Sequence, residues 1–386
     1  MKSFKLIESP KIDNPNIFRH PDIWDAHREG VKAYCDAVRQ NNGDVEIEYK
    51  MKSEYGRYYA KTSKMKSCTS MWNALRSTLF QDENYDIDIV NCHPNILLHL
   101  IGQADDAECL SQYCNDRDKI ISMFKFKEGW LTNYNATQKD NLTEKDVAKQ
   151  LFTILMYGGT IKTWENSQKL TKDDYTLPSF VEEFCQELNV ITYKILKKQE
   201  FAEIKKYVIQ KKREEAKEKA RKENKPFDED YFSVSPAKIL SVILQDEERK
   251  IVTEAINFVQ ERQAKVTAYA YDGFLVRKNG FSPELLDELN EMISRSNQRI
   301  KFIIKPFKPA LDLNVLPPYK SCFDTSFFNS FGLDEYQSKK YYFERYFCKV
   351  YDPPCYVRQD DFGNCKLMKT KDFMDAYNHL TVTVEE

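Results

Sequence analysis

Hydrophobic and polar positions alternate through residues 85–89, and this period of two predicts a β-strand. In such a strand Asp86 and Asp88 lie on one face, while Ile87 and Ile89 lie on the other. Carboxylates beside a buried sheet face are costly unless they are paired, and a bound metal ion is one form of compensation. Taken alone, the segment is equally typical of a surface strand edge or of two capping acids.

A second strand pattern covers residues 266–276 and contains Asp272-Gly273, a dipeptide that strongly favours a tight hairpin. An ordinary turn is the simpler interpretation, because Asp and Gly are common turn residues. If the hairpin lies beside the strand that carries Asp88, however, two carboxylates from distant parts of the chain meet. That arrangement is typical of two-metal sites.

Hydrophobic residues at helical spacing predict helices over much of the remaining chain. One begins near Pro94, a residue suited to a first helical position, and the helical pattern continues to about residue 130. Another is capped by Thr143 and ends at Gly158-Gly159. The remaining predictions are a helical, polar segment over 1–50, helices over 178–222, 236–262 and 282–297, and a basic strand over 300–309.

In the helix that ends at Gly158, the residues Lys145, Lys149, Thr153 and Tyr157 recur at four-residue intervals. This spacing places them on one face that drifts slowly around the helix axis. Two cations on a face that ends in Tyr-Gly suit a triphosphate and a base. A solvated lysine pair with a C-capping glycine fits the same pattern.

Composition and charge narrow the class of protein. The 386-residue chain can bury a sizeable core, and its formal net charge of −2 provides no global basic field, so any nucleic-acid footprint must be local. The mixed-charge run over 205–224 is typical of a solvated helix face, with phosphate binding as the alternative. The ten cysteines lack Cys-x-x-Cys spacing, and the sequence shows neither a signal core nor a membrane span. We therefore expect a soluble, intracellular protein with reduced thiols and no membrane partner.

The order of these parts resembles the three motifs of family A DNA polymerases and of the related single-subunit phage-type RNA polymerases. Upstream, Gly56-Arg57 and the stretch over 67–76 are similar to the segment that precedes the first motif in that family. The three matching segments are Asp88-Ile-Val-Asn-Cys-His93, Lys145-x3-Lys149-x7-Tyr157-Gly158 and Tyr271-Asp272-Gly273.

The signature Asp-Ile-Asp-x-x-Asn-x-His-Pro, which begins at Asp86, is similar to that of a divergent branch found in transposons and large DNA viruses. Members of that branch are often joined to superfamily-3 helicases and are suspected primases. The resemblance covers about residues 55–310. It implies an α+β fold with an antiparallel palm sheet and helical fingers within 51–315, after the segment over 1–50, and with a reduced or absent thumb. It also implies an intracellular location, in a cytoplasmic viral factory or the host nucleus.

The resemblance further implies a template-directed nucleotidyltransferase, a DNA polymerase or primase, whose partners are DNA template, primer and nucleoside triphosphates. Asp88 and Asp272 would hold two Mg²⁺ ions, or Mn²⁺, with Asp86 as a third or outer-shell acid. Lys149 would complete the catalytic set by stabilising charge on the phosphates. The implied nucleotide-binding residues are Lys145, Tyr157, His93 and Asn91, and the implied nucleic-acid-binding residues are Arg57, Arg76 and Gly158.

The chain departs from the family pattern at several positions. His93 replaces a Glu that usually blocks a ribose 2′-hydroxyl, so the choice between DNA and RNA product stays open. A hydrogen-bonded imidazole before Pro94 is an equally good interpretation of His93. Lys145 stands for an Arg, Gly273 for a Glu, and Thr153 for an aromatic residue expected to stack over the incoming base.

The composition changes after the polymerase-like region to a linker over 316–334 and a small module over 335–386. The module resembles the segment that leads into viral superfamily-3 helicases, although no phosphate-binding Gly-x4-Gly-Lys-Ser/Thr follows. We therefore expect the chain to be the N-terminal part of a longer primase-helicase, or to act beside a helicase. The alternatives are an RNA-polymerase-like enzyme, a metal-dependent nuclease and a non-catalytic helicase-loading subunit.

Overall fold

The computed structural model describes residues 3–12, 17, 25–61, 65–102, 107–137 and 142–312, and the strands β10 (Cys355–Gln359) and β11 (Cys365–Lys369). The chain divides into two units, residues 1–312 and 313–386. In the second unit β10 and β11 pair antiparallel. The predicted linker and the rest of the predicted C-terminal module lie outside the described residues. The first unit contains every candidate site residue.

A four-stranded antiparallel sheet, with the strand order β7–β8–β4–β9, lies in the first unit. Its strands are β4 (Asn84–Ile89), β7 (Val266–Tyr269), β8 (Gly273–Arg277) and β9 (Phe302–Lys305). Along β4 the side chains of Ile87 and Ile89 are buried, and Asp86 and Asp88 share the opposite face. The alternation predicted from the sequence is confirmed.

A second antiparallel sheet, of order β1–β2–β3, comes from the N-terminal part of the chain. It consists of β1 (Ser3–Glu8), β2 (Val45–Met51) and β3 (Tyr58–Ala60), and α1 (Asp25–Gln40) packs on β2. The prediction of a helical segment over 1–50 is therefore wrong for β1 and β2. In β2 every second residue is buried and the residues between them are more exposed, which is the period of a strand and not of a helix.

Aromatic side chains join the two sheets. Phe4 of β1 contacts the rings of Tyr49 and Tyr58 at centroid distances of 5.3 and 4.8 Å. All three rings contact Tyr269 of β7 at centroid distances between 5.8 and 6.0 Å. Such offset and edge-to-face pairs stabilise the packing beyond the area that they bury, so β1 and β7 lie side by side.

A fully buried acid, Glu8, lies at the end of β1. Its carboxylate accepts hydrogen bonds from the hydroxyl groups of Tyr34 at 2.8 Å and Tyr49 at 3.1 Å, and from the backbone N–H of Cys68 at 3.0 Å. Burial raises the pKa of Glu8 to about 7, although the hydrogen bonds oppose that shift. The N-terminal sheet is therefore coupled to the protonation of one side chain.

Helices form most of the rest of the first unit, together with the short strands β5 (Lys125–Phe126) and β6 (Tyr175–Thr176). They are α2 (Asn73–Phe80), α3 (Cys92–Ile101), α4 (Glu108–Ser122), α5 (Trp130–Thr137), α6 (Glu144–Met156), α7 (Ile161–Gln168), α8 (Phe180–Leu196), α9 (Ala202–Lys222), α10 (Pro236–Glu261) and α11 (Pro283–Ser294). This mixture of helices and antiparallel sheets confirms the predicted α+β class. No helix in the described ranges is long and apolar enough to cross a lipid bilayer.

Two of the predicted helices are divided in the structure. The helix predicted from 91 to about 130 stops at Gly102. This residue caps the end of α3 with a φ of +83°, a backbone conformation that favours glycine. The helix predicted over 178–222 is interrupted by a short 3₁₀ turn at Gln199–Phe201, where Phe201 is buried between α8 and α9. The first break lies at Gly102 and the short polar stretch after it, whereas the second lies in the charged run 197–200, which is equally typical of an exposed helix face.

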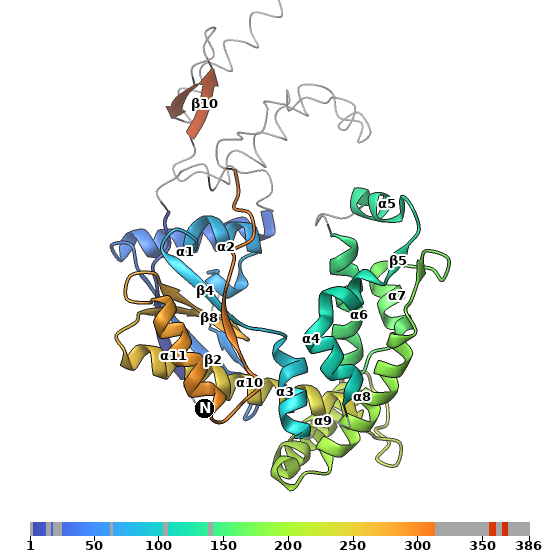
Figure 1. Ribbon diagram of the computed structural model, residues 1–386. Helices are drawn as coiled ribbons and strands as arrows, with labels where there is room; N and C mark the ends of the chain where they lie inside the picture. The colour runs from blue at the N-terminus through green and yellow to red at the C-terminus, as the bar shows by residue number, and fades with distance from the viewer. Residues whose placement is uncertain are drawn as a thin grey trace, which may run out of the picture. The chain divides into compact units, whose positions relative to one another are not determined.

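Helix α10 connects the four-stranded sheet with the helical group, as Figure 1 shows. It contacts β7, β8 and α11 at one part of its length, and α3, α8 and α9 at another. Ser235 caps its N-terminus and Pro236 occupies the first turn, which confirms the predicted start. Two buried carboxylates, Asp246 and Glu248, lie within this helix. Buried acids require partners, and those of Glu248 belong to the site described next.

Candidate active site

Strand pairing brings Asp88 and Asp272 side by side. Asp88 pairs in register with Gly273, the residue that follows Asp272. The backbone N–H of Ile89 donates to the carbonyl oxygen of Asp272 at 3.0 Å, which fixes the hairpin against β4. The structure therefore places two acids from distant parts of the chain at one position on the sheet.

Gly273 permits this approach, and its role differs from the predicted one. The sequence predicts Asp272-Gly273 as the centre of the turn, but Gly273 is the first residue of β8, and the residue with left-handed backbone is Tyr271, with a φ of +59°. A Cβ atom added to Gly273 would lie 2.0 Å from the carbonyl oxygen of Ile87. A larger residue would push β8 away from β4, and with it Asp272 away from Asp88.

The electrostatics of the acid pair favour a bound cation. Burial, followed by the charge of Asp88, raises the pKa of Asp272 to about 6. Lys305 of β9 donates to the carboxylate of Asp88 at 2.8 Å. Divalent cations such as Mg²⁺ and Mn²⁺ prefer carboxylate oxygens, and a cation relieves the repulsion between two neighbouring acids. The donor set of Asp88 and Asp272 therefore fits the predicted metal ions.

Asp86, the predicted third acid, has a different partner. Its carboxylate is buried and lies 3.6 Å from Nη2 of Arg76. Burial raises the pKa of Asp86, and the charges of Arg76 and Lys305 oppose that effect. Arg76 is itself a predicted nucleic-acid contact. Both roles stay predictions, and each requires this ion pair to open or to be shared.

The lysines of α6 occupy the exposed face that the sequence predicts. Lys145, Lys149 and Thr153 are exposed, and the hydrophobic residues of the opposite face are buried. Thr143 caps the helix as predicted. Lys145 forms an exposed ion pair with Asp118 of α4 at 3.0 Å. Its predicted contact with nucleotide therefore competes with a partner on the protein.

Lys149 lies among other cations near the acid pair. Partial desolvation lowers the pKa of its ammonium group, and the positive charges of Arg117 in α4 and Lys305 lower it further. The acids Asp146 and Asp88 oppose this shift without reversing it. A lysine whose main charged neighbours are cations favours an anionic ligand.

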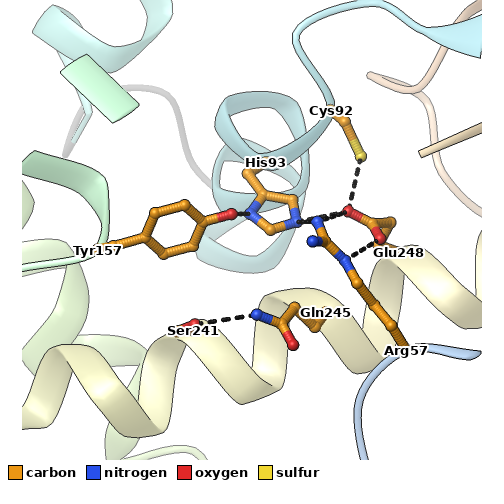
Figure 2. Close-up of polar contacts among 7 residues, drawn as sticks. All are labelled: Arg57, Cys92, His93, Tyr157, Ser241, Gln245 and Glu248. Atoms are coloured by element: carbon orange, nitrogen blue, oxygen red, sulfur yellow. Dashed lines mark hydrogen bonds and ion pairs between the residues drawn. The ribbon is translucent and has the colours of Figure 1, made fainter. Parts of the chain in front are cut away.

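Tyr157 follows the exposed face of α6 that carries Lys145 and Lys149, called the lysine face below. It belongs to a chain of polar contacts drawn in Figure 2. Its hydroxyl oxygen lies 2.6 Å from Nδ1 of His93 in α3, and Nε2 of His93 lies 2.7 Å from Oε2 of Glu248 in α10. Arg57 donates to both oxygens of the same carboxylate at 2.6 Å each. Glu248 thus connects two predicted nucleotide-binding residues with a predicted nucleic-acid-binding residue.

The carboxylate of Glu248 is also one of three potential metal ligands, with Cys92 and His93, that lie within 4.8 Å of one another. A metal ion there would share the carboxylate with Arg57, whose Nη2 lies 3.4 Å from Nε2 of His93. A guanidinium so close repels a second cation. The cluster is better described as an Arg57–Glu248 ion pair extended by an imidazole.

Gly158 ends α6 and contacts α10. Its N–H donates to the carbonyl oxygen of Leu155 at 2.9 Å, and the N–H of Gly159 donates to that of Ile154 at 2.8 Å, which forms a Schellman cap. A Cβ atom added to Gly158 would lie 2.0 Å from the Cβ of Ala237 in α10. The C-capping role that the sequence left open is confirmed, and the close neighbour at this glycine is a helix of the protein. The predicted contact with template stays a prediction.

Asn91 and Arg57 also form contacts within the protein that stabilise the arrangement of the site. Asn91 has a φ of +45° at the start of α3, donates to the carbonyl oxygen of Cys114 at 3.1 Å, and accepts from Arg117. The guanidinium of Arg57 lies over the ring of Tyr271 at 5.2 Å, in addition to its ion pair. The predicted contacts of Asn91 with nucleotide and of Arg57 with nucleic acid require these interactions to open or to be shared.

Glu248, Arg117 and Lys305 are candidate site residues that the sequence analysis does not include. Glu248 had a detectable signal, because it lies four residues from Leu244 and from Val252, on the hydrophobic stripe of a helix. An acid within such a stripe requires a buried partner. Arg117 and Lys305 gave no comparable local signal, because their neighbours are set by helix packing and by strand register.

Comparison with known proteins gives distant similarities. No family model matches the chain. The chain is 27% identical over 272 residues to a protein named putative helicase V13 from Sputnik virophage, and the match covers 67% of this chain and 29% of that protein. The chain is also similar, at 12% identity and a TM-score of 0.37, to the POL domain of Pol1 from M. smegmatis in complex with DNA primer-template and dNTP, over 72% of this chain and 48% of that chain.

Proposed function

We propose that the chain is a template-directed nucleotidyltransferase, a DNA polymerase or primase, in the replication system of a virus or mobile element. The observation that carries the proposal is the meeting of Asp88 and Asp272 near the cation Lys149, which has Arg117 as a further charged neighbour. Transfer of a nucleotidyl group from a triphosphate needs carboxylates for divalent cations and positive charge for the phosphates. The order of the sequence motifs supports the same assignment.

In this proposal Asp88 and Asp272 hold two Mg²⁺ ions, for which Mn²⁺ can substitute. The bound ions supply Lewis-acid activation of the attacking 3′-hydroxyl and offset the charge of the triphosphate. The raised pKa of Asp272 supports this role, because a carboxylate that is buried and lies beside another acid is stabilised by a nearby cation. Lys305 shares the carboxylate of Asp88 with the ions or is displaced from it.

The exposed face of α6 supplies the contacts to the incoming nucleotide. Lys149 stabilises charge on the α- and β-phosphates, with Arg117 beside it. Lys145 contacts the γ-phosphate when it leaves Asp118. The ring of Tyr157 lies at the end of this face, next to the site of the templating base. Thr153 provides no aromatic surface, so the incoming base depends more on Tyr157 and on template pairing.

The four-stranded sheet corresponds in this proposal to the palm, and α6 with its neighbouring helices to the fingers. The reduced or absent thumb remains part of the proposal, and the grip on primer and template comes from residues 160–260 or from a partner protein. The similarity to a viral protein named putative helicase supports a helicase partner, in the same chain or in a separate one. The chain spans 29% of the length of that protein, so the helicase itself is not assigned to this chain.

Magnesium-dependent primer extension tests the proposal. Asp272→Asn should abolish incorporation, whereas the matched change Asp287→Asn, at an exposed position of α11, should leave it unchanged. Equal incorporation by Asp272→Asn and the unaltered protein would refute the catalytic assignment. Pyrophosphate release that depends on nucleotide would separate a polymerase from a nuclease, and cleavage of DNA without nucleotide would identify the nuclease instead.

A further inference from the structure

Glu248 is a buried acid that connects four elements of the structure. It belongs to α10 and has no exposed surface. Its partners are Arg57, in the segment between β2 and β3, and His93 of α3, which continues the chain to Tyr157 after α6 (Figure 2). Cys92 adds a weaker contact, because its sulfur lies 3.9 Å from Oε2. A carboxylate with so many partners constrains the side chains around it.

The charge of Glu248 decides which nitrogen of His93 carries a proton. Burial opposes ionisation of Glu248, but the hydrogen bonds from His93 and Arg57 outweigh it, so its pKa is lowered. An ionised carboxylate only accepts hydrogen bonds. At 2.7 Å from that carboxylate, Nε2 of His93 must therefore be the donor. The other tautomer would place a nitrogen lone pair against the negative oxygen.

The state of Tyr157 follows from that of His93. With the proton on Nε2, the Nδ1 atom of a neutral imidazole is an acceptor. Burial raises the pKa of Tyr157 to about 12, so its hydroxyl keeps its proton and donates to Nδ1 at 2.6 Å. The hydrogen bonds then run in one direction, from Tyr157 through His93 to Glu248. This fixes the orientation of the Tyr157 ring at the end of the lysine face.

We propose that Glu248 is a positioning residue for nucleotide binding, because it selects the Nε2–H tautomer of His93 and thereby holds the hydroxyl and ring of Tyr157 in place. This inference rests on the proposed function, since it assumes that Tyr157 lies beside the incoming nucleotide. Glu248 itself is buried behind His93 and touches no reacting group. The choice of tautomer is a property of the protein alone.

The first test reads the tautomer directly by ¹⁵N NMR of the histidine side chains. The chain has five histidines, so the His93 signal is assigned from its loss in His93→Gln. We expect Nε2 protonated and Nδ1 unprotonated in the unaltered protein, and an added Nδ1–H population in Glu248→Gln. An Nδ1–H tautomer in the unaltered protein, or protons on both nitrogens at pH 8, would overturn the inference. This measurement needs no turnover, so it stands even if the chain is not a polymerase.

The second test follows the effect of Glu248 through Tyr157 in a double-mutant cycle. Glu248→Gln should raise the KM for nucleotide about tenfold, the usual effect of losing a hydrogen bond to a charged group, with a smaller change in kcat. In a Tyr157→Phe background, Glu248→Gln should change that KM by less than about twofold. Glu247→Gln is the matched control, because Glu247 is the preceding residue of α10 and pairs with Lys250 on the surface.

The outcomes of the cycle separate positioning from loss of structure. A KM rise of the same size in both backgrounds would show that Glu248 does not act through Tyr157, and would overturn the inference. If Glu248→Gln fails to fold, Glu248→Asp replaces it in the same cycle, and the tautomer in the unaltered protein still decides the first test. Absence of nucleotide binding in every variant and in the unaltered protein would contradict the proposed function and leave the tautomer result valid.

Discussion

Replacing Gly273 by alanine tests how closely β8 lies against β4. The added Cβ atom would meet the carbonyl oxygen of Ile87 at 2.0 Å and the Cα of Asp88 at 3.0 Å. Both are backbone atoms, so no side-chain rotation can relieve the contact. Ordinary contact begins at 3.4 Å, so the strands must separate by about 1.4 Å at this position. Overpacking and weakened strand pairing should together lower the free energy of unfolding by about 2–4 kcal/mol.

The same displacement moves Asp272 away from Asp88. A shift of about 1 Å in a catalytic group can reduce a rate by about 100-fold, so incorporation by Gly273→Ala should fall at least that far. Urea unfolding measures the stability, and primer extension measures the rate. Gly43→Ala is the control, because Gly43 has a φ of +99° but no atom within 4 Å of an added Cβ. It should cost about 1 kcal/mol of backbone strain and leave incorporation unchanged. Unchanged stability and incorporation in Gly273→Ala would refute the described approach of the two strands.

Two further substitutions test buried charges. The pKa of Glu8 in the folded protein, about 7, lies above its ordinary value of 4.5, so the stability linked to its protonation is present below pH 4.5 and is lost as the pH rises through 7. Glu8→Gln should remove this pH dependence of the free energy of unfolding, which amounts to about 3 kcal/mol. If the difference in stability between the variant and the unaltered protein is the same at pH 5 and at pH 8, the burial of Glu8 is contradicted. Arg57→Ala should lower the free energy of unfolding by about 3–5 kcal/mol, because it leaves the carboxylate of Glu248 buried without its main counter-charge. Thermal unfolding that is the same as for the unaltered protein would contradict the role of Arg57 as the counter-charge of buried Glu248.

Local patterns predicted the parts of the site that depend on local geometry. The alternation through Asp86 and Asp88 gave the two faces of β4, because a strand repeats every two residues whatever its neighbours are. The four-residue spacing of Lys145 and Lys149 gave the exposed face of α6 for the same reason. The cap at Thr143 was equally local, since its partner lies three residues along the chain.

Contacts between distant segments could not be predicted from the sequence. The close neighbour of Gly158 is Ala237, and nothing in the sequence near either residue indicates that α10 begins against the end of α6. The ion pair of Arg57 with Glu248 was equally hidden, because a partner on a distant helix leaves no local pattern beside Arg57; its predicted contact with nucleic acid stays a prediction. Lys305 reaches Asp88 because β4 and β9 pair in one particular register. Local hydrophobic patterns do not predict which strands pair or in which register.

Binding of Mn²⁺, measured by electron paramagnetic resonance titration of the unaltered protein and its variants, tests the shared cation site most directly. If Asp88 and Asp272 hold cations together, Asp88→Asn and Asp272→Asn should each remove the same tight sites, and the double variant should be no worse than either one. Asp287→Asn should bind as the unaltered protein does. Mn²⁺ binding that is unaffected by one or both of the single substitutions would contradict the account.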